Sequence, residues 1–380
     1  MRTYLKHASV LLLAIVCILT AAVTAFAKTP SEARTAALSY LTDNVRTPVV
    51  NSVGGEWTIL ALARGNAAVN SGYYNGYISR VKQTLRDNGG VLPGSSSRKT
   101  EYSRVVIALT ALGEDVTNFG GYNLLLPLAN FNDVKAQGIN GATYALIAFD
   151  TNAWEIPAIT DSAAQTTRQK LIDEILRREV AGGGFAQDGV NVSADTTAMV
   201  LQALAPYQSD TAVAAVIENA LAVISGMEEA DGGFLYGTEG ETAESAAQVV
   251  TALAVLGIDP TTDERFARAG GKNPVTALLA FQQSDGSFRH NEAGTGNVQM
   301  ATEQAAYALV AYDRFLSGKN SLYNMGDAAA KSEPDDEEPE PTTLEKWRAN
   351  LPDWLSFLGT LPDFLAWIVI VVFFGWIWLV

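Results

Sequence analysis

The sequence predicts an all-α protein whose folded part is a closed ring of about twelve paired helices, an α/α toroid or α6/α6 barrel. Three observations lead to this prediction. Alanine-rich apolar segments recur about six times, amphipathic segments alternate with them, and two of the apolar segments read VVIALTALGED (105–115) and VVTALAVLGID (249–259). Seven of their eleven positions are identical, which indicates an internal helical repeat.

The six alanine-rich segments are apolar on nearly every side. A helix of this kind is buried all round, and small alanine side chains suit helices that crowd about a common axis. We therefore expect inner helices at residues 56–64, 101–112, 142–149, 195–204, 244–256 and 303–312.

Six amphipathic segments alternate with the inner ones. Each carries a polar face as well as an apolar one, which is typical of a helix with one side in solvent. We expect outer helices at residues 31–42, 77–86, 122–128, 163–179, 211–224 and 274–282. An open helical solenoid is the alternative to a ring, but it would need polar capping repeats at both ends, and the sequence has no separate caps.

A second repeated element joins outer to inner helices in the C-terminal half. Its three copies, which we call clasps, read AGGGFAQDG (181–189), EADGGFLYG (229–237) and QQSDGSFRH (282–290). Their glycines allow the positive φ of a tight turn. The phenylalanine that follows is expected to anchor each turn to the ring, so we interpret the clasps as structural.

Residues 1–27 have the pattern of a signal peptide, expected to form a helix before its removal. Arg2 and Lys6 precede an apolar run at 8–23, and small residues follow it at the predicted cleavage site. Export is therefore expected, with the ring domain at residues 28–325. The only cysteine, Cys17, lies in this signal, so the exported chain has no disulfide.

The C-terminal part is expected to tether the ring to a membrane. Residues 326–343 form an acidic, proline-rich linker, 344–363 suit an interfacial amphipathic segment, and 364–380 are an uncharged run that favours a transmembrane helix over a buried core helix. We expect the protein on the extracellular face of a bacterial cell membrane. Without the signal, 24 basic residues face 41 acidic ones, a net charge of −17 that disfavours nucleic acid as a partner.

The clasps resemble the prenyltransferase and squalene-oxidase repeat family, whose turns run Gln-x-x-Asp-Gly-x-Phe/Trp. This family includes triterpene cyclases, protein prenyltransferase β subunits, vitamin carriers similar to transcobalamin, and complement-type thioester domains. The resemblance covers roughly residues 30–320 and is most specific in the last three repeats. It implies a terpenoid-cyclase-like ring, a fold that hosts unrelated functions.

The chain departs from the catalytic patterns of that family. Prenyltransferase β subunits bind zinc through Asp, Cys and His, whereas the comparable stretch here holds Glu244 and Ala246 and no cysteine, so neither a metal nor another cofactor is expected. The missing cysteine also excludes a thioester. The cyclase motif Asp-x-Asp-Asp-Thr-Ala corresponds to residues 193–198, where Asp195 is kept and both flanking acids are lost.

Acidic or polar side chains occupy the first turn of each expected inner helix. Acids at this position complement the helix dipole and cap free amides, each contributing about 0.3–1 kcal/mol. A sharper hypothesis is that they line the mouth of a central cavity and bind something cationic or rich in donors, beside aromatic stacking surfaces. The candidate ligand-binding residues are Glu56, Trp57, Glu101, Asn140, Tyr144, Asp195, Glu244, Glu303 and Tyr307.

Two classes of function follow from these residues. The first is a surface-displayed, membrane-tethered binding module, non-catalytic, that holds a small molecule, peptide or cell-wall component at the mouth of the ring. The alternative is a terpenoid-cyclase-like enzyme, or a carboxylate-based lyase or hydrolase, that uses Asp195 and Glu244 as acid and base. His290, in the third clasp, is expected to be a rim residue and neither a ligand nor a base.

Overall fold

The computed structural model describes residues 28–50 and 52–329, which are all-helical as predicted. This part of the chain contains twelve α-helices, three short 3₁₀-helices and isolated β-bridges, without a β-strand. The expected signal peptide, the linker from residue 330 onward and the segments 344–363 and 364–380 lie outside the described residues. Within residues 28–50 and 52–329, no helix combines the length and the apolar character needed to cross a membrane.

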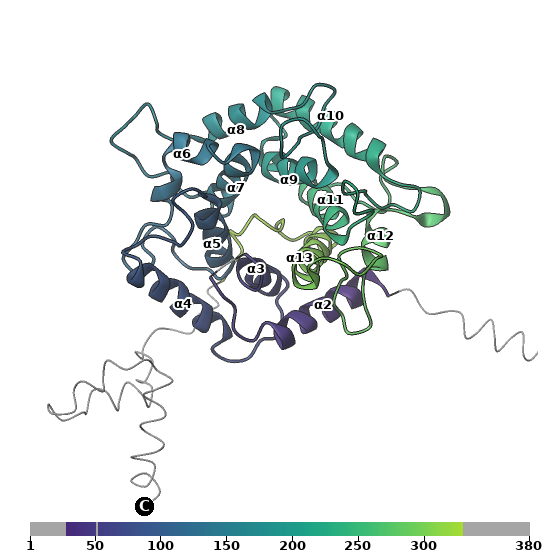
Figure 1. Cartoon of the computed structure of the whole chain (residues 1–380), viewed down its shortest axis with the longest axis horizontal. Helices are drawn as coiled ribbons and strands as arrows, with labels where there is room; N and C mark the ends of the chain where they lie inside the picture. Colours follow the sequence, from purple (N-terminus) through teal and green to yellow (C-terminus); the bar gives the residue numbers. More distant parts are fainter. Residues whose placement is uncertain (1–27, 51, 330–380) are drawn as a thin grey trace, which may run out of the picture. The chain divides into compact units, whose positions relative to one another are not determined.

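Six helices pack against one another around a central axis (Figure 1). Each contacts the next one in this set along the chain, and the last contacts the first, so the contacts form a closed cycle. The inner helices are α3 (Glu56–Arg64), α5 (Thr100–Ala111), α7 (Gly138–Asp150), α9 (Ala194–Leu204), α11 (Ala243–Leu256) and α13 (Val298–Leu316).

Six further helices lie outside the inner set (Figure 1). They are α2 (Pro30–Asn44), α4 (Tyr73–Asp87), α6 (Phe131–Lys135), α8 (Arg168–Arg177), α10 (Thr211–Met227) and α12 (Pro274–Ala280). Burial separates the two sets as their sequences predict. Thirteen of the fourteen residues of α11 are buried, against five of the seventeen in α10, which presents a single apolar face to the inner helices.

Three predicted helices are placed differently in the structure. The outer helix expected at 163–179 is the shorter α8, which begins at Arg168 because the side chain of Thr167 caps it by accepting from the backbone amide of Lys170. The sixth inner helix begins at Val298, because the side chain of Asn297 caps its first turn by accepting from the backbone amide of Met300. Glu303 is therefore not a first-turn residue, and that prediction was wrong. Residues 122–128 contain only the 3₁₀-helix Leu126–Leu128, and the short α6 follows instead, with Asn130 as its N-cap.

The clasps form tight turns with their phenylalanine side chains fully buried. In the third clasp, Gly286 has φ +94° and lies against α2. A Cβ at this position would stand 2.4 Å from the carbonyl oxygen of Ala36. The side chain of Gln282 also donates to the carbonyl of Ala33 at 2.8 Å. The last clasp thus joins the final repeat to the first helix of the domain.

Buried polar side chains also link the two ends of the domain. Glu303 of α13 accepts hydrogen bonds from the amide of Gly54 (2.8 Å) and the hydroxyl of Thr58 at the start of α3. Arg64, at the end of α3, donates to three carbonyl oxygens of the segment 317–329, which crosses the ring in Figure 1. These contacts hold the last described residues against the first inner helix.

The contact between the third clasp and α2 can be tested with Gly286→Ala. The substitution forces a Cβ into the left-handed region and against a backbone carbonyl, whereas Gly182→Ala, at φ +96° with nothing within 4 Å, has only the conformational cost of about 1 kcal/mol. We expect Gly286→Ala to lower the free energy of unfolding by about 2 kcal/mol more than Gly182→Ala in urea denaturation. Equal losses would contradict the close packing of this turn on α2.

Candidate functional site

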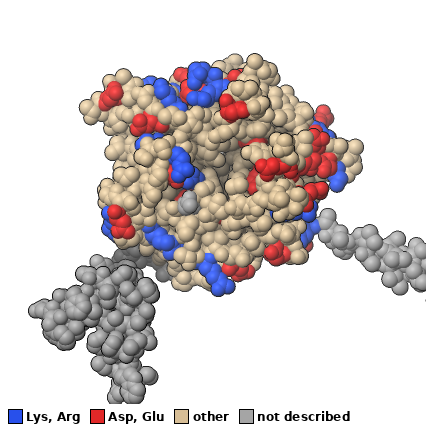
Figure 2. Space-filling model, in the orientation of Figure 1, with Lys and Arg blue, Asp and Glu red and all other residues tan. Residues whose placement is uncertain are grey.

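Four neighbouring inner helices present side chains to a pocket of about 250 Å³, which we call the N-end pocket. On each helix two of the lining residues are four positions apart, the spacing that places side chains on one helix face, and Thr196 and Ser245 add to the lining. The pairs are Asn140 and Tyr144 on α7, Asp195 and Met199 on α9, Glu244 and Gln248 on α11, and Met300 and Gln304 on α13. Figure 2 shows a hollow at the centre of the ring, with acidic residues gathered on the side of α11 and α12.

Three side chains of the lining each contain an oxygen atom that has no hydrogen-bond partner among the described residues. The three atoms are Oδ1 of Asn140, Oδ1 of Asp195 and Oε1 of Glu244, and each atom is buried. A buried acceptor that receives no donor costs about 1–3 kcal/mol, and such atoms are rare in folded proteins. Because these three come from three successive inner helices, the pocket is arranged to accept several hydrogen bonds at once.

An imidazole held between two carboxylates forms one wall of the N-end pocket. Nδ1 of His290 lies 2.8 Å from Oε2 of Glu244, and Nε2 lies 2.8 Å from Oε2 of Glu239. Burial lowers the pKa of His290, but the two glutamates together raise it above its ordinary value. Since carboxylates only accept, a protonated imidazole satisfies both of them by donating from each nitrogen.

Burial also changes the titration of the two acids in the pocket. It raises the pKa of Asp195, because a charged carboxylate loses its hydration there. Burial likewise raises the pKa of Glu244, with a further contribution from the charge of Asp195, although His290 opposes the shift. Among residues 28–50 and 52–329, no group of three or more His, Cys, Asp or Glu side chains is placed to hold a metal ion.

The predicted aromatic residues form a cluster beside the pocket. The ring of Trp57 lies 5.8 Å from that of Tyr144 and 5.9 Å from that of Tyr307, measured between centroids. Only Tyr144 lines the pocket itself. Tyr307 is connected to the lining through Gln248, whose side chain donates a hydrogen bond to the tyrosine hydroxyl.

The other three predicted acids are bound within the protein. Glu56 is buried, accepts from the hydroxyl of Tyr77 at 3.1 Å and faces Arg104. Glu101 pairs with the same Arg104, and Glu303 closes α13 onto α3 as described above. The structure therefore brings Asn140, Tyr144, Asp195 and Glu244 together in one pocket and places these three acids outside its lining.

Sequence reasoning missed most of the remaining lining. His290 was expected to be a rim residue only, yet it contacts Glu244 directly. Gln248 and Gln304 were not singled out, although each lies four residues after a lining position on its helix. That spacing was a usable signal for Gln248. It was not usable for Gln304, because the start of α13 was placed too late in the sequence.

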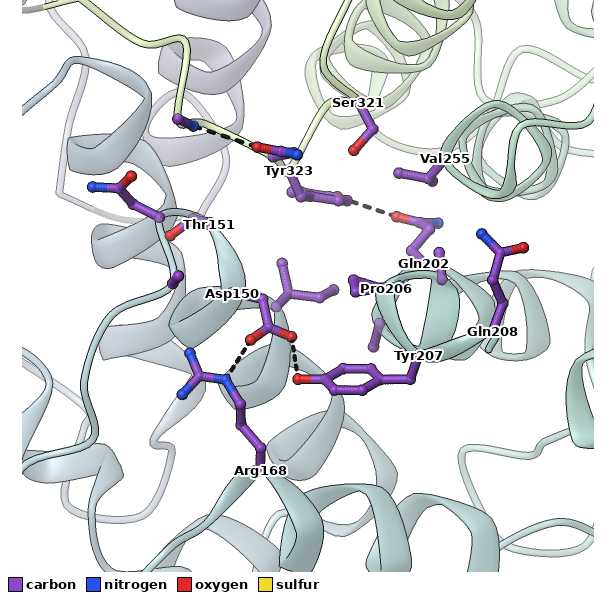
Figure 3. Close-up of a pocket in the computed structure, with 17 residues that line it drawn as sticks. Asp150, Thr151, Arg168, Gln202, Pro206, Tyr207, Gln208, Val255, Ser321 and Tyr323 are labelled. Atoms are coloured by element: carbon purple, nitrogen blue, oxygen red, sulfur yellow. Dashed lines mark hydrogen bonds and ion pairs between the residues drawn. The ribbon is translucent and has the colours of Figure 1, made fainter. Parts of the chain in front are cut away.

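A chain of hydrogen bonds separates the N-end pocket from a second cavity of about 710 Å³, the C-end cavity. Gln248 donates to Gln304 and Tyr307, and Gln202 donates to Gln248. The hydroxyl of Tyr323, from the segment that crosses the ring, donates to Gln202 at 3.1 Å (Figure 3). The two hollows are thus distinct sites joined through one polar partition.

Comparison with known proteins leaves the site to be interpreted from its own chemistry. No protein-family model matches this chain, and no curated protein matches it.

Glu56 should make the stability of the protein depend on pH. Burial raises its pKa from 4.5 to about 7, so its contribution to stability is fully present below pH 4.5 and is lost as the pH rises through about 7. Glu56→Gln cannot ionise and should raise the free energy of unfolding by up to about 3 kcal/mol at pH 8 and by little at pH 4. Urea denaturation at both pH values measures this difference.

The control for this experiment is Glu218→Gln, which removes a carboxylate whose side chain is 71% exposed. It should leave the pH dependence of the wild type unchanged. If Glu56→Gln and the wild type lost stability equally between pH 4 and pH 8, Glu56 would not carry the proton that its burial implies.

Proposed function

We propose that this chain is a membrane-tethered surface protein of the prenyltransferase and squalene-oxidase repeat family, and that it binds an organic ammonium ion in the N-end pocket. The observation that carries the proposal is the set of three buried, unpaired oxygens on Asn140, Asp195 and Glu244. An ammonium group has three donors and a positive charge. It would complete the hydrogen bonding of these oxygens and offset the charge of the two carboxylates.

The architecture supports the toroid and the family in this proposal. The closed cycle of contacts among the inner helices is what an α/α toroid requires. The repeated clasps, each with a buried phenylalanine, favour the family resemblance. Residues 1–27 and 364–380 support export and a membrane anchor through their composition alone.

The lining favours binding over terpenoid chemistry. Ten of its fourteen residues are polar or charged, and Tyr144 and Tyr236 are its only carbocyclic aromatic rings among the described residues. Its volume of about 250 Å³ lies below the roughly 300–1,000 Å³ of typical ligand pockets, which suits a small ligand or a single side chain. A cyclase would need a larger aromatic cavity and neighbouring acids to strengthen its proton donor.

A second candidate is a lyase or hydrolase that uses Asp195 and Glu244 as acid and base. Burial raises the pKa of both carboxyl groups, which favours a role in proton transfer. Native mass spectrometry of the purified protein distinguishes the classes. A co-purifying amine supports the binding function, whereas a terpenoid or a cleaved glycan would favour catalysis.

The proposed site should bind n-butylammonium, a probe with the size and charge of a lysine side chain. We expect titration calorimetry at pH 7.5 to detect binding to the wild type and at least tenfold weaker binding to Asp195→Asn/Glu244→Gln, which lacks both negative charges. 1-Butanol, which has no positive charge, should not bind. Glu218→Gln/Glu264→Gln is the matched control, since it removes two carboxylates outside the pocket and should bind as the wild type does.

The affinity for this probe should rise with pH. Burial raises the pKa of Asp195 and Glu244, so lowering the pH protonates these acids more readily than free side chains and also adds positive charge to His290. Raising the pH from 5 to 7.5 shifts both acids toward the charged form and His290 toward the neutral form, so both changes favour a cation. Equal affinity at the two pH values, or equal binding by the double variant, would overturn the proposed site.

A further inference from the structure

The C-end cavity lies where α7 and α9 end (Figure 3). The hydrogen bond from Gln202 to Gln248 separates it from the N-end pocket. Asp150 and Thr151 at the end of α7, and Pro206 and Tyr207 after α9, form one side of its lining. The segment 317–329 supplies the other side through Ser321, Tyr323, Asn324 and Gly326. Its volume of about 710 Å³ is within the usual range of ligand pockets.

The segment 317–329, which forms one side of the cavity, is held in place by hydrogen bonds. The amide of Met325 donates to the carbonyl of Thr151 at 2.7 Å, and the hydroxyl of Tyr323 reaches Gln202. Arg64 binds three carbonyl groups of the same segment. A site that is already ordered loses little conformational entropy when a ligand binds.

Asp150 and Arg168, the only charged residues among the described lining residues, form an ion pair with each other. Oδ1 of Asp150 accepts from Nε of Arg168 at 2.7 Å, and Oδ2 accepts from the hydroxyl of Tyr207 at 2.7 Å (Figure 3). The guanidinium also donates to the carbonyls of Phe149 and Trp154. Both carboxylate oxygens and most of the guanidinium donors are thus used within the protein, so the cavity does not favour a charged ligand.

Uncharged polar groups provide the remaining recognition. The side chains of Asn152, Gln208 and Ser321 line the cavity and form no hydrogen bond with any other described residue. Amides and hydroxyls can each donate and accept, as the hydroxyl groups of a sugar do. The half-buried ring of Tyr207 and the side chains of Pro206 and Val255 add apolar surface of the kind that packs on a sugar face.

We propose that the C-end cavity binds a neutral saccharide through Asn152, Gln208 and Ser321, with Tyr207 as its apolar support. This site is separate from the N-end pocket and does not depend on the function proposed for that pocket. Its ligand differs in chemical class, being uncharged and rich in hydroxyl groups.

The test is titration of the full chain with maltotriose, cellotriose and tri-N-acetylchitotriose. At least one of these neutral trisaccharides should bind with a Kd below 1 mM, and the charged trimers of glucosamine and galacturonic acid should bind at least tenfold more weakly. A trisaccharide that binds more tightly than its monosaccharide identifies a glycan chain as the source of the ligand. Equal affinity identifies a free sugar.

Variants locate the binding. Asn152→Ala/Gln208→Ala removes two side chains that bear no hydrogen bonds within the described part of the fold, so the protein should stay folded by circular dichroism and bind at least tenfold more weakly. Asp195→Asn/Glu244→Gln should bind the sugar as the wild type does, since it alters only the other pocket. The proposal is overturned if no neutral trisaccharide binds at 10 mM, if Asn152→Ala/Gln208→Ala binds unchanged, or if only the N-end variant loses binding.

Discussion

The packing of six small-residue helices about one axis is the constraint on which the rest of the structure depends. A helix surrounded on all sides approaches its neighbours closely where small side chains face them, and α11 has alanine at five of its fourteen positions. The same packing brings the starts of α7, α9, α11 and α13 to a common pocket. Polar residues near those helix ends therefore meet, although they are far apart in the sequence.

Position relative to the N-end pocket separates the structural acids from the candidate functional ones. Glu56, Glu244 and Glu303 look similar in the sequence. In the structure Glu303 accepts hydrogen bonds from Gly54 and Thr58, and Glu56 accepts one from the hydroxyl of Tyr77. These three acids and Asp195 each keep one buried oxygen that no described residue satisfies, but only Asp195 and Glu244 line the N-end pocket. Access to the pocket therefore distinguishes these two acids from their structural counterparts, which burial and an unpaired oxygen alone do not.

Much of the fold was predictable because helix periodicity and turn chemistry are local. The range of α3 was predicted to the residue, and α9 and α11 to within one residue at the start. The errors have physical reasons. The N-cap Asn297 starts α13 at Val298, earlier than its first acid suggested, so Glu303 lies beyond the first turn. The chain before α6 contains Pro127, which limits it to a single 3₁₀ turn.

By itself the sequence determined the helices, their alternation between buried and half-exposed, and four of the residues that line the N-end pocket, because burial pattern and capping are properties of short segments. Only the tertiary structure decided which acids line the N-end pocket, that His290 joins Glu239 to Glu244, and that Tyr323 and Gln202 help divide the interior into two sites. These contacts join residues that are 46 to 121 positions apart in the sequence. No local sequence pattern specifies contacts over such separations. Those side chains meet because the inner helices form a closed cycle of contacts, which no short stretch of sequence specifies.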